Sequence, residues 1–192
     1  MKGKTTFWAC TITILILCLA DGALTYIATP DLSLEGNPLV AYWGLGWPAL
    51  FVANLLFIAL FVAAAHYAFV KYKGPVISAK TYVEYMCILA FNQPGKFIWL
   101  LYKLPKNWKP FGAMMGYAGC FSFIIGRSIV VLEWVLHLSN SHLSDIYQTF
   151  RSHLFWHRID ILCAILSFTL LIIYWTIKEY RNNQTTTHRP HD

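Results

Sequence analysis

Long apolar runs, interrupted by single polar residues, dominate the pattern of this chain. A bilayer core of roughly 30 Å needs about 20 apolar residues in an α-helix, because each residue adds about 1.5 Å. Four runs reach that length, over residues 7–28, 47–69, 111–138 and 159–177. Trp and Tyr residues gather near several of their ends, as in the aromatic belts of membrane proteins. The pattern predicts an all-α, polytopic transmembrane helical bundle with four spans.

A fifth segment, residues 81–104, is also long enough to span, but its centre is the polar sequence Asn92–Lys96 with a Pro-Gly break. Such a break would free backbone groups that lipid cannot satisfy with hydrogen bonds. We therefore expect two short interfacial or re-entrant pieces that meet at Asn92–Lys96. A fifth span is the alternative.

Composition supports a membrane protein. Hydrophobic residues make up 57% of the 192 residues and charged residues only 12%, where soluble domains carry about 25%. This deficit excludes a disordered protein or a coiled coil and argues against an ordinary water-soluble enzyme. The net charge of +6 does not indicate nucleic acid, because the cations lie at the ends of apolar runs and no nucleic-acid motif is present. The expected partner is the lipid bilayer.

The distribution of Lys and Arg predicts the topology. Basic residues precede the first span, follow the fourth and crowd the segment between the second and third, whereas the loop after the first span carries Asp31 and Glu35. The positive-inside rule then places both termini and the lysine-rich segment in the cytoplasm, for a multi-pass protein of the cell (inner) membrane.

The chain reads as one transmembrane domain, residues 1–181, followed by a polar, aperiodic tail over 182–192 that is predicted to be disordered and cytoplasmic. The first run could also be a cleaved signal peptide. Its length of 22 residues exceeds a typical signal-peptide core, which favours an uncleaved first span.

Two charges fall inside predicted spans. Asp21 lies 14 residues into the first span and Arg127 lies 16 residues into the third, about 21 and 24 Å from the cytoplasmic side. Since an ionisable group at membrane depth is costly unless it is paired, we predict an Asp21–Arg127 ion pair. Its role is either to lock two helices together or to take part in catalysis. Glu133 lies on a different helix face from Arg127 and should not pair with it.

Histidines and acids gather near the predicted outer boundary. His153, His157 and Asp160 are spaced i, i+4, i+7, a ligand pattern for zinc or another divalent metal. Glu35 in the facing loop is the fourth candidate ligand, and Glu133 and His137 end the third span at the same level. The alternative is a set of solvated or ion-paired interfacial residues.

Two short motifs flank the first loop. Asp21 and Thr25 are four residues apart, and Glu35-x-Asn37-Pro38 follows, with Asn37 as an N-cap and Pro38 at the first position of a helix. This order resembles a family of small, uncharacterised prokaryotic membrane proteins with an Asp-x-x-x-Thr first span and a Glu-x-Asn-Pro loop. The resemblance covers roughly residues 12–60, implies no activity, and marks those five positions. The lysine-rich central segment and the histidine-bearing outer loop depart from it.

These observations leave two main functional hypotheses, and whether the chain is an enzyme stays open. The first is a membrane-embedded site at the outer face that binds a divalent cation or moves protons. The alternative is a non-catalytic subunit or assembly factor, for which Gly112-x-x-x-Gly116 would offer a helix-packing site to another subunit or a second copy. A transporter is a weaker third hypothesis.

Overall fold

The computed structural model describes residues 2–34, 37–139, 142–152 and 159–187. These residues form helices and loops and contain no strand. Four of the described helices are long and apolar enough to cross a membrane: α1 (Lys2–Ala28), α3 (Trp47–His66) with its π-helical continuation η1 (Tyr67–Lys71), α6 (Trp108–Ser139) and α8 (Ile159–Thr187). The predicted all-α, four-span bundle is confirmed, and the chain is an integral membrane protein.

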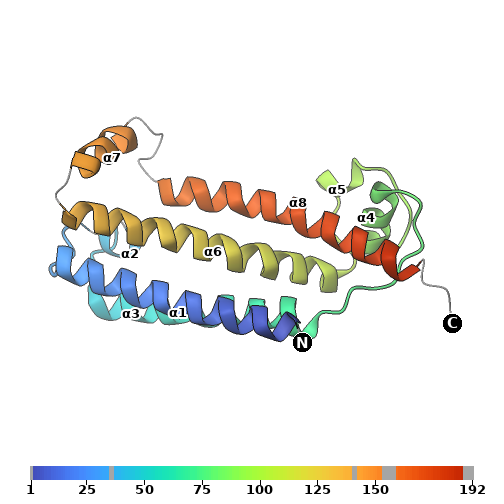
Figure 1. Cartoon of the computed structure of the whole chain (residues 1–192), viewed down its shortest axis with the longest axis horizontal. Coiled ribbons are helices and arrows are strands. Elements are labelled where there is room, and N and C mark those ends of the chain that lie inside the picture. The colour runs from blue at the N-terminus through green and yellow to red at the C-terminus, as the bar shows by residue number, and fades with distance from the viewer. Residues whose placement is uncertain (1, 35–36, 140–141, 153–158, 188–192) are drawn as a thin grey trace.

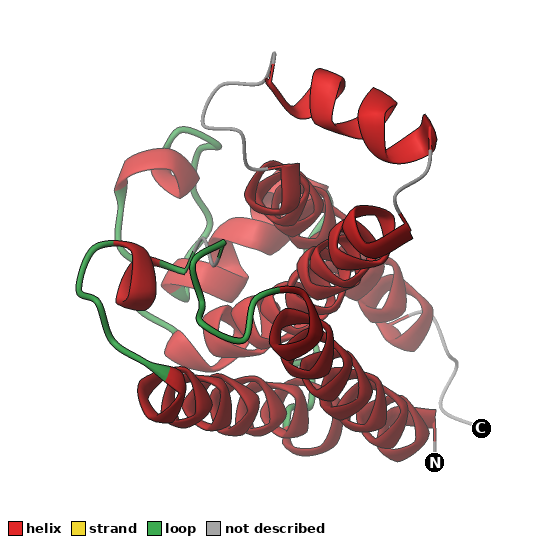
Figure 2. Ribbon diagram, turned by 90° about the vertical axis from the view of Figure 1, so that its left-hand side faces the viewer, coloured by secondary structure: helices red, strands yellow, loops and turns green. Residues whose placement is uncertain are grey.

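The four long helices lie side by side, with α6 at the centre (Figure 1). α1, α3 and α6 pack against one another, while α8 packs along α6. The start of α1 and the end of α8 lie at the same end of the bundle, and Figure 2 views the bundle from the opposite end. Large apolar side chains such as Leu56 and Leu170, each 66% exposed, cover the outer surfaces of the spans. Such surfaces contact lipid rather than water.

Glycines let α6 approach its neighbours closely. A Cβ on Gly116 would lie 2.6 Å from the carbonyl oxygen of Ala64 in α3, so only glycine fits there. A Cβ on Gly112 would lie 3.4 Å from the ring of Tyr67. The Gly112-x-x-x-Gly116 patch therefore packs against α3 and η1 within this chain.

Segment 81–104 forms two short helices, α4 (Tyr82–Phe91) and α5 (Trp99–Tyr102). The Thr81 hydroxyl caps α4 by accepting a hydrogen bond from the amide of Glu84 at 3.2 Å. Asn92 ends α4 in the left-handed conformation, with φ of 60°. The ten residues of α4 reach only about 15 Å, half of a bilayer core, so a fifth span is excluded.

Two short helices lie at the end of the bundle where α1 ends. α2 (Pro38–Ala41) begins as predicted, because the Asn37 side chain accepts a hydrogen bond from the Leu39 amide at 3.0 Å. It is separate from the second span, which starts at Trp47. α7 (His142–Ser152) lies between the predicted third and fourth spans, where no helix was predicted.

The end of α8 differs from the prediction. The helix continues to Thr187, so residues 182–187 are helical and not disordered, while 188–192 lie outside the described residues. Asn183 is buried, at 5% exposure. Its side chain accepts a hydrogen bond from the amide of Ile77 at 2.8 Å and donates one to the carbonyl oxygen of Ile77 at 2.6 Å. The pair of hydrogen bonds fixes the extended chain between η1 and α4 onto α8.

Candidate functional site

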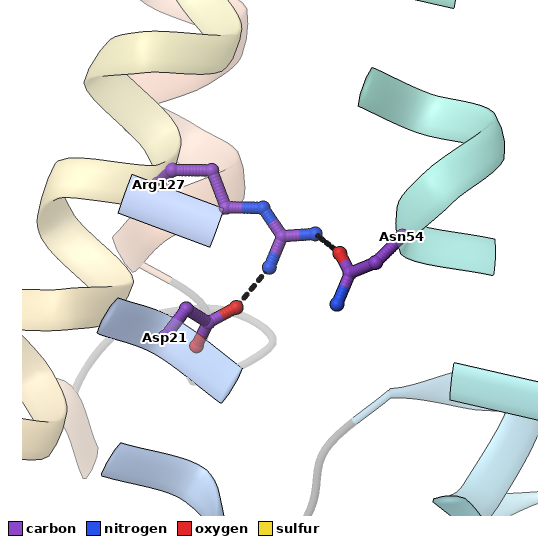
Figure 3. A network of polar contacts seen from close by, with 3 residues as sticks. All are labelled: Asp21, Asn54 and Arg127. Atoms are coloured by element: carbon purple, nitrogen blue, oxygen red, sulfur yellow. Dashed lines mark hydrogen bonds and ion pairs between the residues drawn. The ribbon is translucent and has the colours of Figure 1, made fainter. Parts of the chain in front are cut away.

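A polar network joins three spans inside the bundle. Arg127 of α6 forms an ion pair with Asp21 of α1 through one guanidinium nitrogen, and the other donates a hydrogen bond to the Asn54 side chain of α3 at 2.7 Å (Figure 3). Asp21 is buried, at 6% exposure. The structure thus brings together the two charges whose depths matched in the sequence.

Asn54 is the member of this network that sequence reasoning missed. It lies seven residues after the start of α3, and Asp21 lies seven residues before the end of α1. Because α1 and α3 are consecutive spans that run in opposite directions, both side chains lie about 10 Å from the same end of the bundle. That match in depth, applied to a polar residue in an apolar run, could have identified Asn54.

A cavity of about 880 Å³ extends from this network between the spans. Its lining residues come from α1, α3, α6, α8 and the loop before α2. On α6 the lining runs from Gly119 to His137, which corresponds to about 27 Å along the helix axis. The cavity is therefore an elongated pocket that follows the membrane-crossing direction.

The two ends of the pocket differ in chemistry. The end near the loops carries ionisable side chains from three spans: Asp21, Arg127, Glu133, His137 and Asp160. The deeper end is walled mainly by aromatic and aliphatic side chains: Phe57, Phe61, Phe123, Ala164, Ile165 and Phe168. A pocket with this division fits a molecule that has a polar head and an apolar tail.

The carboxylates at the polar end are held by defined neighbours. Glu133 accepts a hydrogen bond from Tyr147 of α7, while Arg127 turns to Asp21 and Asn54, so Glu133 and Arg127 use different partners as predicted from their faces. Asp160, near the start of α8, is buried at 7% exposure.

Phe123 and Ser122 also line the pocket. The ring of Phe123 lies 5.3 Å from the guanidinium carbon of Arg127, a cation–π contact. At the deeper end the Ser122 hydroxyl is buried and has no hydrogen-bond partner among the described residues.

Three of the four predicted metal ligands, Glu35, His153 and His157, lie outside the described residues. Asp160, the fourth, lines the pocket together with Glu133 and His137. Within the described ranges no group of three His, Cys, Asp or Glu side chains could hold a metal ion. The zinc or other divalent-metal site therefore stays a prediction.

Four of the five marked motif positions are described, while Glu35 lies outside the described residues. Asp21 and Asn37 line the pocket, Thr25 is buried one helical turn beyond Asp21, and Pro38 is the first residue of α2. The loop between them is shaped by Asp31. Hydrogen bonds from the backbone and hydroxyl of Ser33, and from the hydroxyl of Thr29, lower the pKa of Asp31 below its usual value.

Comparison with known proteins gave no match: no family model, curated protein or solved structure is similar to this chain. The pocket and its polar network therefore carry the functional argument.

Proposed function

We propose that this integral membrane protein binds an amphiphilic, lipid-like molecule in the pocket between α3, α6 and α8. The observation that carries the proposal is a single cavity of about 880 Å³ with an ionisable end and an apolar end, set among the spans. Its volume falls within the range of about 300–1,000 Å³ that ligand pockets occupy. Its long axis runs along the spans, as the tail of a lipid does.

The polar end favours a head group that donates hydrogen bonds. Three of its side chains carry carboxyl groups. An ionised carboxylate can only accept hydrogen bonds, and it offers about four lone-pair positions. The one arginine at this end is already engaged by Asp21 and Asn54. An ammonium or hydroxyl-bearing head therefore fits better than a phosphate or carboxylate head. Aromatic faces beside these acids add cation–π attraction for an ammonium group.

The deeper end suits an apolar chain. Phe57 and Phe61 of α3 and Ile165 and Phe168 of α8 all line the pocket, so a chain lying there would contact side chains of both helices. Asp21 of the Asp-x-x-x-Thr motif and Asn37 of the Glu-x-Asn-Pro motif line the pocket, with Asp21 at the opposite, polar end. We infer that these motif positions mark the part of the pocket that receives the head group.

The proposed orientation puts the polar end of the pocket toward the outer side of the cell (inner) membrane and both termini in the cytoplasm. The lysine-rich segment, the start of α1 and the end of α8 share one end of the bundle, which supports this orientation by the positive-inside rule. C-terminal reporters fused after Tyr72, Pro110 and Glu179 should read cytoplasmic, and one after Ser139 should read external. The reverse pattern would show that the bundle has the opposite orientation in the membrane and would contradict this proposal.

The binding experiment uses the full chain in lipid nanodiscs and a fatty amine that carries a fluorophore at the end of its alkyl tail. Ile165→Trp adds bulk to a pocket-lining residue that is 54% exposed, so it narrows the pocket without disturbing helix packing. Leu166→Trp is the matched control, because Leu166 is 55% exposed and does not line the pocket. A fatty acid with the same tail and label tests the head group.

We expect the amine to bind at least tenfold more tightly than the acid. Ile165→Trp should weaken amine binding at least tenfold, and Leu166→Trp should leave it within twofold. Equal binding to both tryptophan variants would show that the probe enters the bulk lipid and not the pocket, and would contradict the proposal.

A divalent cation is the second candidate, favoured by the metal-ligand spacing of His153, His157 and Asp160 in the sequence and by the acids, Asp160 among them, at the polar end of the pocket. It would replace the ammonium group as the positive charge between these acids. This hypothesis requires that the purified protein carries metal and that His157→Ala loses it. Protein that carries no metal and keeps its stability in that variant would remove this candidate and leave the amphiphile proposal standing.

A further inference from the structure

The segment between α4 and α6 combines positive charge with exposed apolar side chains. Residues 96–109 contain four lysines and no acidic residue. All four lysines are exposed, and five large apolar residues among them are each more than half exposed. We call the nine residues the basic aromatic surface: Lys96, Phe97, Ile98, Tyr102, Lys103, Leu104, Lys106, Trp108 and Lys109.

Trp99 gives this surface a fixed shape. The Lys103 ammonium lies 3.4 Å from the centre of the Trp99 ring, a cation–π contact. The Trp99 ring also lies against Gly95, where a Cβ would come within 2.5 Å of it. The Phe91 ring packs edge-on against the Trp99 ring, with 6.2 Å between the two ring centres. The indole is therefore held between the Pro-Gly turn and the lysine, and it sets where the Lys103 charge lies.

Backbone hydrogen bonds tie the same segment to α4. The amides of Lys106 and Asn107 both donate to the carbonyl oxygen of Ala90, at 2.8 and 3.0 Å. The thiol of Cys87 donates to the carbonyl oxygen of Lys96 at 3.6 Å. The surface is thus anchored at both of its ends to a helix that packs on α8 and α6.

We propose that the basic aromatic surface binds the head groups of anionic phospholipids, on the membrane side where the start of α1 and the end of α8 lie. Exposed aromatic and aliphatic side chains insert at the boundary between head groups and acyl chains, and lysines beside them attract anionic lipid. The surface leads directly into α6, whose first residue is Trp108, so it lies at the level where a span enters the bilayer.

The same geometry selects the interfacial form of segment 81–104 over the re-entrant form. A re-entrant path that turns at Asn92–Lys96 would carry Lys96 into hydrocarbon, where a charged side chain is costly unless it is paired. An acidic protein or a nucleic acid would satisfy the lysines but leave the five exposed apolar side chains in water. A lipid surface satisfies both.

Native mass spectrometry of the full chain in detergent, titrated with equal amounts of phosphatidylglycerol and phosphatidylcholine, tests the proposal. The test variant is Lys103→Gln/Lys106→Gln. The matched control is Lys71→Gln/Lys73→Gln, which removes the same charge from two exposed lysines outside the basic aromatic surface. Circular dichroism and a melting curve check that both variants keep the fold.

Wild type should retain phosphatidylglycerol in preference to phosphatidylcholine. The preference should fall by about fivefold for each lysine removed from the surface, since a lysine near an anionic surface contributes about that factor in binding. The control pair should stay within twofold of wild type, and Lys96→Gln/Lys109→Gln should behave like the test pair. An unchanged preference in the test variant, or an equal loss in the control, would overturn the assignment.

Discussion

Replacing Arg127 by methionine removes the positive charge of the polar network and keeps most of the side-chain volume. The Asp21 carboxylate would then remain inside the bundle without its ion-pair partner, and the Asn54 side chain would lose the hydrogen bond it accepts. The structure therefore predicts a loss of stability that comes from the acid left behind and not from lost packing.

The magnitude follows from burial. Breaking a buried ion pair by removing one partner costs about 3–5 kcal/mol, and a charged residue at the centre of a membrane helix costs about 2.5–3.5 kcal/mol. The Arg127 side chain keeps 20% of its surface exposed and that of Asp21 keeps 9%, which places the cost near the lower end, at about 3 kcal/mol. Asp21→Asn/Arg127→Met leaves no unpaired charge, so it should be about 2 kcal/mol more stable than the sum of its single changes predicts.

The assay is equilibrium unfolding in mixed micelles with a rising fraction of sodium dodecyl sulfate, followed by circular dichroism, for the wild type, both single variants and the double variant. Ser128→Ala is the control: it changes an exposed neighbour on α6 whose hydroxyl bonds only within its own helix, and it should cost less than about 0.5 kcal/mol. Strictly additive single effects, or an Arg127→Met variant as stable as Ser128→Ala, would refute the reasoning.

Three further predictions concern packing and pH. Asn183→Ala leaves the buried amide and carbonyl of Ile77 without partners, which should cost about 2 kcal/mol and speed hydrogen exchange at that amide at least tenfold. Gly116→Ala should cost about 1–3 kcal/mol in the same unfolding assay because its Cβ meets a carbonyl of α3, whereas Gly112→Ala should be neutral or stabilising. Hydrogen bonding lowers the pKa of Asp31 in the folded chain, so this residue supports the 29–34 turn above its unfolded pKa and loses that support as pH falls through the folded pKa. Exchange protection of the turn, corrected for intrinsic rates, should therefore drop in acid, and Asp31→Asn should lack this pH dependence.

Features set by length, period and depth could be predicted from the sequence. The four spans follow from apolar runs, since lipid requires about 20 apolar residues per crossing. The meeting of Asp21 and Arg127 follows from equal depth together with the cost of an unpaired charge in a membrane. The break at Asn92–Lys96 follows from a Pro-Gly pair that no membrane helix accommodates without help.

Features set by how helices face one another could not be predicted in the same way. The pocket exists because α3 and α8 lie on different sides of α6, an arrangement that depends on which glycines of α6 contact which helix. The helix α7 was not predicted because its segment is polar overall. Its apolar residues Leu143, Ile146 and Phe150 are nevertheless spaced i, i+3 and i+7, as on one helix face. The burial of Asn183 depends on a chain segment more than 100 residues earlier, which no local pattern reveals.

The most direct test of the pocket as a binding site is photo-crosslinking inside cells. A benzophenone amino acid placed at position 165 reports what occupies the pocket, and the same group at position 166 reports the surrounding lipid. We expect mass spectrometry to find one amphiphile with an ammonium- or hydroxyl-bearing head group on position 165, enriched at least tenfold over its share at position 166. The same mixture of lipids at both positions would contradict the proposal that the pocket selects a ligand.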